Sequence, residues 1–100
     1  LTQIAVILQQ LSNRFPNDLN WILRIDGHTD RVPIHTQLFN SNWELSTARA
    51  VSVVRFLANN GIPEDRMAAT GFSKFHPIDP AETLEAYRKN RRIEMKLTAR

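Results

Sequence analysis

Apolar residues recur at helical spacing through the first fifteen positions of the chain. They share one side of a helix, and Pro16 followed by Asn17 and Asp18 ends the pattern. We therefore expect an amphipathic helix over residues 1–15 that covers a sheet. The apolar positions are Ile4, Ile7, Leu8, Leu11 and Phe15.

A buried strand is predicted directly after that helix. Residues 21–25 form a short apolar run, partly β-branched, that ends at Asp26 and Gly27. The tripeptide His-Thr-Asp at 28–30 therefore comes at the carboxyl end of the strand. Residues 31–40 show neither helical nor alternating periodicity, and a loop of about ten residues is long enough to suggest a binding role.

The clearest helix signal lies in the middle of the chain. Ser41 and Glu44 have the spacing of a capping box, and Gly61 supplies a left-handed stop. We therefore expect a helix from Ser41 to Asn59. Four apolar positions share one sector of this helix, and Arg49 lies at the margin of that sector. The apolar positions are Ala50, Val53, Val54 and Leu57.

The remaining residues repeat the alternation of strand and helix. Residues 62–66 predict a turn, 67–72 a strand and 73–80 a loop. A polar helix is expected from residue 81 to about residue 90. A final half-exposed strand follows, because apolar and polar side chains then alternate. Its apolar members are Ile93, Met95 and Leu97.

Length and composition fit one small domain built from these elements. A chain of 100 residues with 42% hydrophobic content supports one core. The order helix, strand, helix, strand, helix, strand predicts an α+β fold, a two-layer α/β sandwich with helices on one face of a small mixed sheet. We expect residues 1–100 to form a single domain. Because the chain begins inside a predicted helix, we also expect a fragment of a longer protein, with any targeting or anchoring segment upstream.

Charge and cysteine content narrow the functional classes. The chain has 13 Lys and Arg against 10 Asp and Glu, and much of the excess lies in residues 88–92. Cations at a helix end complement its dipole, and acidic residues occur in the same segments, so a broad nucleic-acid-binding face is not indicated. The absence of cysteine excludes a disulfide framework and any thiolate zinc site. No segment approaches the roughly 20 apolar residues that cross a bilayer.

Opposite charges are predicted on two neighbouring elements. Asp30 follows the first strand, and Arg49 lies on the second turn of the next helix. A carboxylate and a guanidinium held near each other can bind a zwitterionic amino acid, and the helix N-terminus adds N–H donors. In another interpretation Asp30 caps the loop and Arg49 pairs with Glu44 or Asp26. Spacing alone favours this second interpretation, because loop aspartates commonly bond nearby backbone.

Other chemistries have weaker support in the sequence. His28, Asp30 and His35 are metal-ligand types, but no H-x-x-x-H pair accompanies them, so we expect no metal and no cofactor. No serine lies in a G-x-S-x-G turn. Asp26 could join Asp30 as a carboxylate pair for glycan cleavage, but it fits better as a strand-end residue.

Several segments together resemble the OmpA/MotB family of peptidoglycan-associated domains. No one segment is specific, but their order and spacing from Trp21 to Leu97 form a specific signature. The resemblance implies a two-layer fold of the βαβαβ type, no catalytic activity, and non-covalent binding of peptidoglycan. The matching segments are IDGHTD at 25–30, NWELSTARA at 42–50, GIP at 61–63, GF at 71–72 and NRRIE at 90–94.

The resemblance also assigns residues to the site and reverses the preference for a loop-capping Asp30 and an ion-paired Arg49. It implies that Asp30 meets the ammonium of the diaminopimelate in the stem peptide and that Arg49 meets its carboxylate. Further residues are expected to line or support this pocket. The lining residues are Thr29, Asn42 and Leu45, and the supporting residues are Asn90 and Arg91.

Residues 31–34 and 41–46 look closer to flagellar motor protein B than to outer-membrane protein A. This likeness implies a periplasmic domain of a Gram-negative bacterium, anchored upstream in the inner rather than the outer membrane, and suggests a homodimer. It places the family's first strand before Leu1. Many members carry Gly-Arg where this chain has Ala86-Tyr87. A basic nucleic-acid-binding domain and a wall-cleaving enzyme remain the alternative functions.

Overall fold

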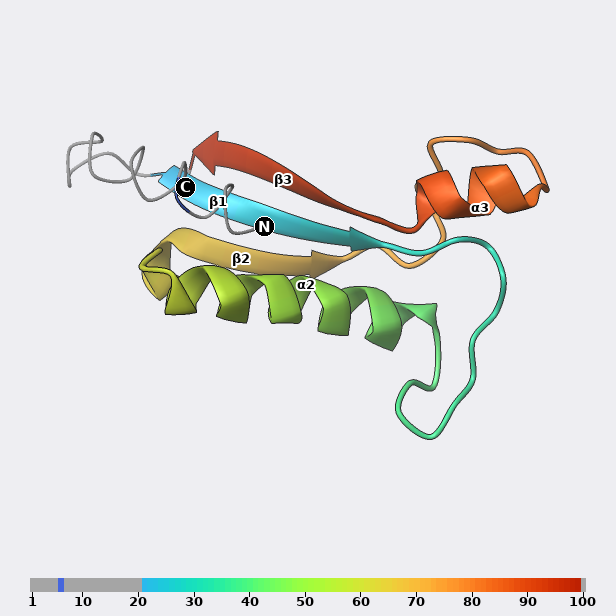
Figure 1. Ribbon diagram of the computed structural model, residues 1–100, viewed down its shortest axis with the longest axis horizontal. Helices are drawn as coiled ribbons and strands as arrows, with labels where there is room; N and C mark the ends of the chain where they lie inside the picture. Colours follow the sequence, from blue (N-terminus) through green and yellow to red (C-terminus); the bar gives the residue numbers. More distant parts are fainter. Residues whose placement is uncertain (1–5, 7–20, 100) are drawn as a thin grey trace.

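The computed structural model describes Val6 and residues 21–99, which form three strands, two α-helices and a short 3-10 helix (Figure 1). The predicted helix at 1–15 lies outside the described residues, apart from Val6, which is helical and exposed. No helix of the described residues is long and apolar enough to cross a membrane. The elements are β1 (Trp21–His28), α2 (Asn42–Asn59), η1 (Glu64–Arg66), β2 (Met67–Gly71), α3 (Leu84–Asn90) and β3 (Arg92–Ala99).

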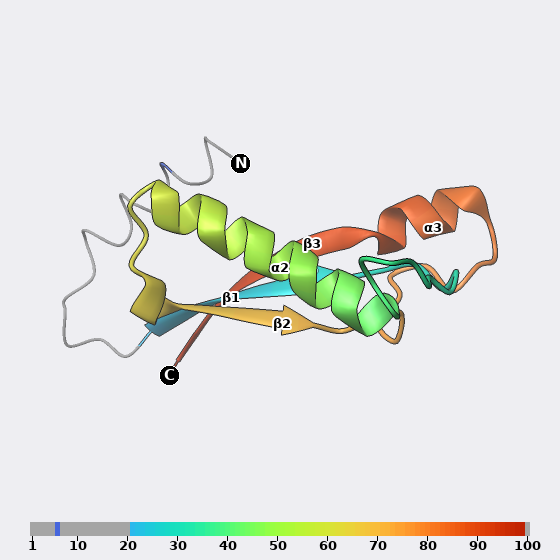
Figure 2. The ribbon, with the colours of Figure 1, turned by 90° about the horizontal axis from the view of Figure 1, so that it is seen from below.

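The three strands form one mixed sheet in the order β2-β1-β3. β1 is parallel to β2 and antiparallel to β3. α2 runs along one face of the sheet and packs on β1 and β2, as the two views show (Figures 1 and 2). The predicted α+β class with a small mixed sheet is therefore confirmed.

The core lies between α2 and the sheet. Of the four apolar positions predicted for α2, three are buried and Val54 is partly buried. Gly27 marks a close approach of the two layers, because a Cβ at this position would lie 2.1 Å from the backbone oxygen of Ser46. This contact brings the second turn of α2 against the carboxyl end of β1. The buried core residues are Leu23, Ile25, Ala50, Val53, Leu57 and Ile62.

The first strand is longer than predicted, and the prediction that Asp26 ends it is wrong. β1 continues through His28, and Asp26 is a fully buried residue within it. The Arg24 guanidinium donates three hydrogen bonds to the Asp26 carboxylate, from Nε to Oδ1 at 2.8 Å and to Oδ2 at 3.1 Å, and from Nη2 to Oδ2 at 2.9 Å. The Nζ of Lys96 on β3 lies 4.0 Å from Oδ2 of Asp26. A carboxylate is tolerated inside the strand because these cations neutralise it.

The last helix begins at Leu84 rather than at residue 81. The Thr83 hydroxyl caps it by accepting a hydrogen bond from the Ala86 N–H at 3.1 Å. α3 lies past the end of the sheet, beside the carboxyl end of β1 and the loop that follows it (Figure 1). Ala86 and Asn90 are its only buried residues, and Leu84 at its start is exposed.

Candidate functional site

A cavity of about 260 Å³ lies where β1 ends and α2 begins. Asp30 and Arg49 both line it, so the structure brings the two predicted charged residues to one cavity. It also brings in four of the other predicted residues, while Asn90 lies outside the lining. The lining residues are Thr29, Asp30, Val32, Pro33, Ile34, Asn42, Leu45, Arg49 and Arg91.

The two carboxylate oxygens of Asp30 have different surroundings. Oδ1 accepts a hydrogen bond from the Val32 N–H at 3.0 Å, so Asp30 does cap the loop as the alternative interpretation supposed. Oδ2 lies 3.6 Å from Nη1 of Arg91, which is half exposed. That distance is longer than a good charge-assisted hydrogen bond. Oδ1 is thus engaged by the loop backbone, whereas Oδ2 makes only this longer contact with Arg91.

Arg49 has no carboxylate partner among the described residues, so the alternative of an ion pair with Glu44 or Asp26 is wrong. The Asp26 carboxylate binds Arg24. The Ser41 hydroxyl donates to the Glu44 carboxylate, and this bond holds the pKa of Glu44 below its ordinary value. The guanidinium of Arg49 makes one long hydrogen bond, from Nη1 to the backbone oxygen of His28 at 3.4 Å. Its other N–H groups have no hydrogen-bond partner among the described residues.

The walls of the cavity are held by bonds between the loop and α2. The Asn42 side chain donates to the backbone oxygens of Val32 at 3.2 Å and of Asp30 at 3.5 Å. The Thr29 hydroxyl donates to the Asp30 backbone oxygen at 2.9 Å. Leu45 adds a half-buried apolar side chain. Asn42 and Thr29 therefore fix the backbone that carries the Asp30 carboxylate.

Asn90 supports the site from behind the cavity. Its side chain is buried and accepts hydrogen bonds from the N–H groups of Ile78 at 2.8 Å and Asp79 at 3.1 Å. It also donates to the backbone oxygen of Asp79 at 2.9 Å. These bonds fix the loop before α3 against the last residue of that helix. Ala86 and Tyr87, which stand where many family members have Gly-Arg, do not line the cavity.

His28 points to the opposite face of the sheet, because its neighbour Gly27 faces α2. Its ring stacks on Phe72 with centroids 4.9 Å apart. Burial, helped by the positive charge of Arg92, lowers the pKa of His28. His35 instead contacts the backbone oxygen of Asn40. Across the part of the chain that the structure describes, no three His, Cys, Asp or Glu side chains are placed to hold a metal ion.

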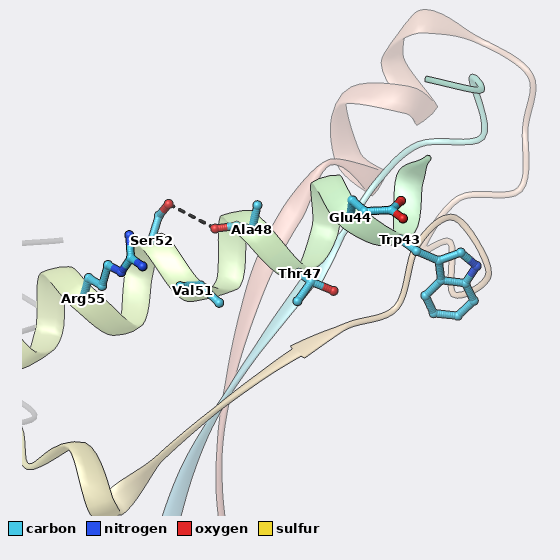
Figure 3. Close-up of a pocket in the computed structure, with 7 residues that line it drawn as sticks. All are labelled: Trp43, Glu44, Thr47, Ala48, Val51, Ser52 and Arg55. Atoms are coloured by element: carbon cyan, nitrogen blue, oxygen red, sulfur yellow. Dashed lines mark hydrogen bonds between the residues drawn. The ribbon is translucent and has the colours of Figure 1, made fainter. Parts of the chain in front are cut away.

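A larger hollow of about 630 Å³ lies along the outer side of α2 (Figure 3). Its two charged residues, Glu44 and Arg55, stand at opposite ends of the hollow. The two residues are eleven positions apart in the sequence, which corresponds to about 16 Å along the helix axis. A single amino-acid head group cannot bridge charges that far apart. The smaller cavity between Asp30 and Arg49 is therefore the better candidate for a zwitterion.

Sequence comparison identifies the family of the chain that carries this cavity. The profile of the OmpA family matches residues 2–91. The chain belongs to the OmpA family. Uncharacterized protein YtxE of Bacillus subtilis is 40% identical over 96 residues, which are 95% of this chain and 36% of that protein. Motility protein B of the same organism is 38% identical over 77 residues, 76% of this chain and 30% of that protein.

Structural comparison agrees with the family assignment. The crystal structure of the periplasmic domain of Helicobacter pylori MotB matches with a TM-score of 0.82 and 28% identity. The match covers 98% of this chain and 57% of that one. This chain spans about a third of the length of the two curated Bacillus relatives. The predicted OmpA/MotB resemblance is thereby confirmed.

Some residues of this site were not singled out in the sequence. Val32, Pro33 and Ile34 line the cavity, and only the length of their loop indicated a binding role. Ser46 is fully buried, and its hydroxyl accepts a hydrogen bond from the Ser73 N–H at 3.1 Å. No sequence signal marks this contact, because a serine in a helix is usually read as a surface residue.

Proposed function

We propose that this domain binds peptidoglycan through the diaminopimelate of the stem peptide and thereby anchors a membrane protein or complex to the cell wall. The observation that carries the proposal is that Asp30 and Arg49 line one cavity while neither is tied up in a close ion pair. A cavity lined by both an anionic and a cationic group suits a ligand that bears both charges.

The geometry supports a division of roles between the two residues. The ammonium at the side-chain end of diaminopimelate approaches Oδ2 of Asp30, whose Oδ1 is held by Val32. The neighbouring carboxylate takes the unpaired N–H groups of Arg49, near the positive end of α2. Thr29, Asn42 and Leu45 shape the cavity around the ligand. Arg91 lies beside the Asp30 carboxylate, and Asn90 holds the loop behind the cavity.

The names of the relatives support a binding role in the cell envelope. They refer to motility, to a periplasmic domain and to the outer membrane, and not to a catalytic activity. We accordingly propose a periplasmic domain without enzymatic activity, tethered to the inner membrane by a segment outside this sequence and paired as a homodimer. Relatives occur in Bacillus subtilis and in Helicobacter pylori. The resemblance to flagellar motor protein B supports the proposal of a Gram-negative origin.

The direct test of the proposal is co-sedimentation of the purified protein with sacculi of the diaminopimelate type. We expect the protein to pellet with the sacculi and to release no soluble muropeptides. Binding should weaken little between about 50 and 200 mM salt, because one zwitterion pocket releases few counterions. Muropeptide release that disappears in an Asp30→Asn variant would instead show a wall-cleaving enzyme.

The same protein also tests the nucleic-acid alternative. A protein that tracks phosphates loses orders of magnitude in affinity over that salt range. Duplex DNA bound more tightly than sacculi at physiological salt would replace the proposed function with nucleic-acid binding. The charge pattern argues against this result, since the cations Arg92 and Lys89 already have acidic neighbours in Glu94 and Glu85.

A further inference from the structure

A second cavity, of about 370 Å³, opens beside the first. Two pairs of adjacent residues connect the cavities. Asp30 and Arg91 line the first, whereas Arg31 and Asn90 line the second. The cavities therefore flank one junction, formed by the segment that follows β1 and the end of α3. A ligand longer than a single amino acid can extend across this junction from one cavity to the other.

The second cavity presents a cation that has no anionic partner. Among the described residues, no carboxylate lies within 4 Å of the Lys74 ammonium, which sits 5.8 Å from the centroid of the Phe75 ring. Arg31 adds a second cation, paired with the exposed Glu82. The carboxylate of Asp79 is already engaged, by the Ala81 N–H at 3.0 Å and by a lysine of α3 at 3.9 Å. The free charge in this cavity is therefore positive.

The backbone that carries Lys74 is held in place on several sides. The Ser73 N–H donates to the Ser46 hydroxyl of α2 at 3.1 Å, and the Ser73 backbone oxygen accepts from the Thr29 N–H at 3.0 Å. Ser73 itself adopts a left-handed conformation with φ of 56°. The Phe75 ring packs on Trp43, with centroids 5.5 Å apart. Lys74 thus extends from a fixed turn rather than from a free loop.

We propose that this second cavity binds a carboxylate on the residue next to diaminopimelate in the same stem peptide. The proposal rests on the proposed function of the first cavity. In the stem peptide, D-isoglutamate precedes diaminopimelate and has a free α-carboxylate unless it is amidated. A D-alanine follows and ends in a carboxylate in the tetrapeptide. Either carboxylate would complement Lys74 and Arg31, and the two sources can be separated chemically.

Calorimetry with three forms of the tetrapeptide L-Ala-γ-D-Glu-diaminopimelate-D-Ala tests the proposal. One form is unmodified, one carries D-isoglutamine, and one has a C-terminal D-alanine amide. We expect one of the two amides to bind wild type about three- to fivefold more weakly, as for a solvent-accessible ion pair. The Lys74→Gln variant should bind the unmodified peptide more weakly than wild type by the same factor. It should bind the unmodified peptide and the weaker-binding amide with equal affinity.

Arg55→Gln is the matched control, because it removes an exposed cation from α2 outside both cavities. It should retain the wild-type preference among the three peptides. Equal affinity of wild type for all three, or a Lys74→Gln variant that still discriminates, overturns the second cavity as a carboxylate site. If, in that case, Arg49→Ala binds none of the three peptides that wild type binds, the proposed function stands. If wild type binds none of the peptides, both proposals fail.

Discussion

Replacing Arg49 by alanine is expected to reduce affinity for sacculi by about one and a half to three and a half decades. Truncating one partner of a charge-assisted contact costs about 2–5 kcal/mol, since the other charge is left unpaired in a partly dehydrated pocket. Arg49→Lys should recover little of this loss, because an ammonium cannot reproduce the planar fork that a carboxylate accepts. Co-sedimentation at increasing sacculus concentration measures both variants.

The fold should tolerate the loss of Arg49. Its side chain makes one long hydrogen bond, to His28, and no ion pair among the described residues, so we expect the free energy of unfolding to change by less than about 1 kcal/mol. Arg55→Ala on the exposed side of the same helix controls for the loss of a positive charge. Wild-type binding by a folded Arg49→Ala protein would contradict the role given to this residue.

A similar loss, of about two decades, is expected when Asp30 becomes asparagine. The amide oxygen of Asp30→Asn can still accept the Val32 N–H, so the loop keeps its cap while the negative charge disappears. This separates charge recognition from loop structure better than alanine does, because Asp30→Ala removes both. Affinity for a diaminopimelate peptide, measured by calorimetry, reports the difference.

Asp65→Asn offers a matched control for this change. Asp65 is exposed on η1, away from both cavities, and its substitution removes the same charge. It should bind like wild type. If Asp30→Asn also binds like wild type, Asp30 acts as a loop cap alone, and the ammonium must be recognised elsewhere.

The sequence predicted those parts of the structure that depend on local signals. Ser41 caps α2 as its spacing with Glu44 indicated, and the helix ends at Asn59, shortly before Gly61. Asp30 and Arg49 could be paired because each lies close to the point where the chain passes from β1 to α2. The resemblance then decided between two interpretations of these residues that spacing alone had left open.

The features that the sequence did not predict depend on contacts between distant segments. Asp26 was assigned to the end of β1 because the apolar run of that strand stops there. Lys96, brought alongside by β3, helps Arg24 to neutralise it inside the sheet. The second cavity was missed for the same reason, because contacts of Ser73 with Ser46 and with Thr29 place Lys74 near the end of β1.

The comparison of two stem peptides tests the central claim most directly. One carries diaminopimelate, and the other carries lysine, which keeps the side-chain amine but lacks the carboxylate proposed to meet Arg49. Calorimetry should show that wild type binds the diaminopimelate peptide at least about a hundredfold more tightly than the lysine peptide. Arg49→Ala should weaken the binding of the lysine peptide little further. Equal affinity of wild type for the two peptides would show that Arg49 does not read the diaminopimelate carboxylate.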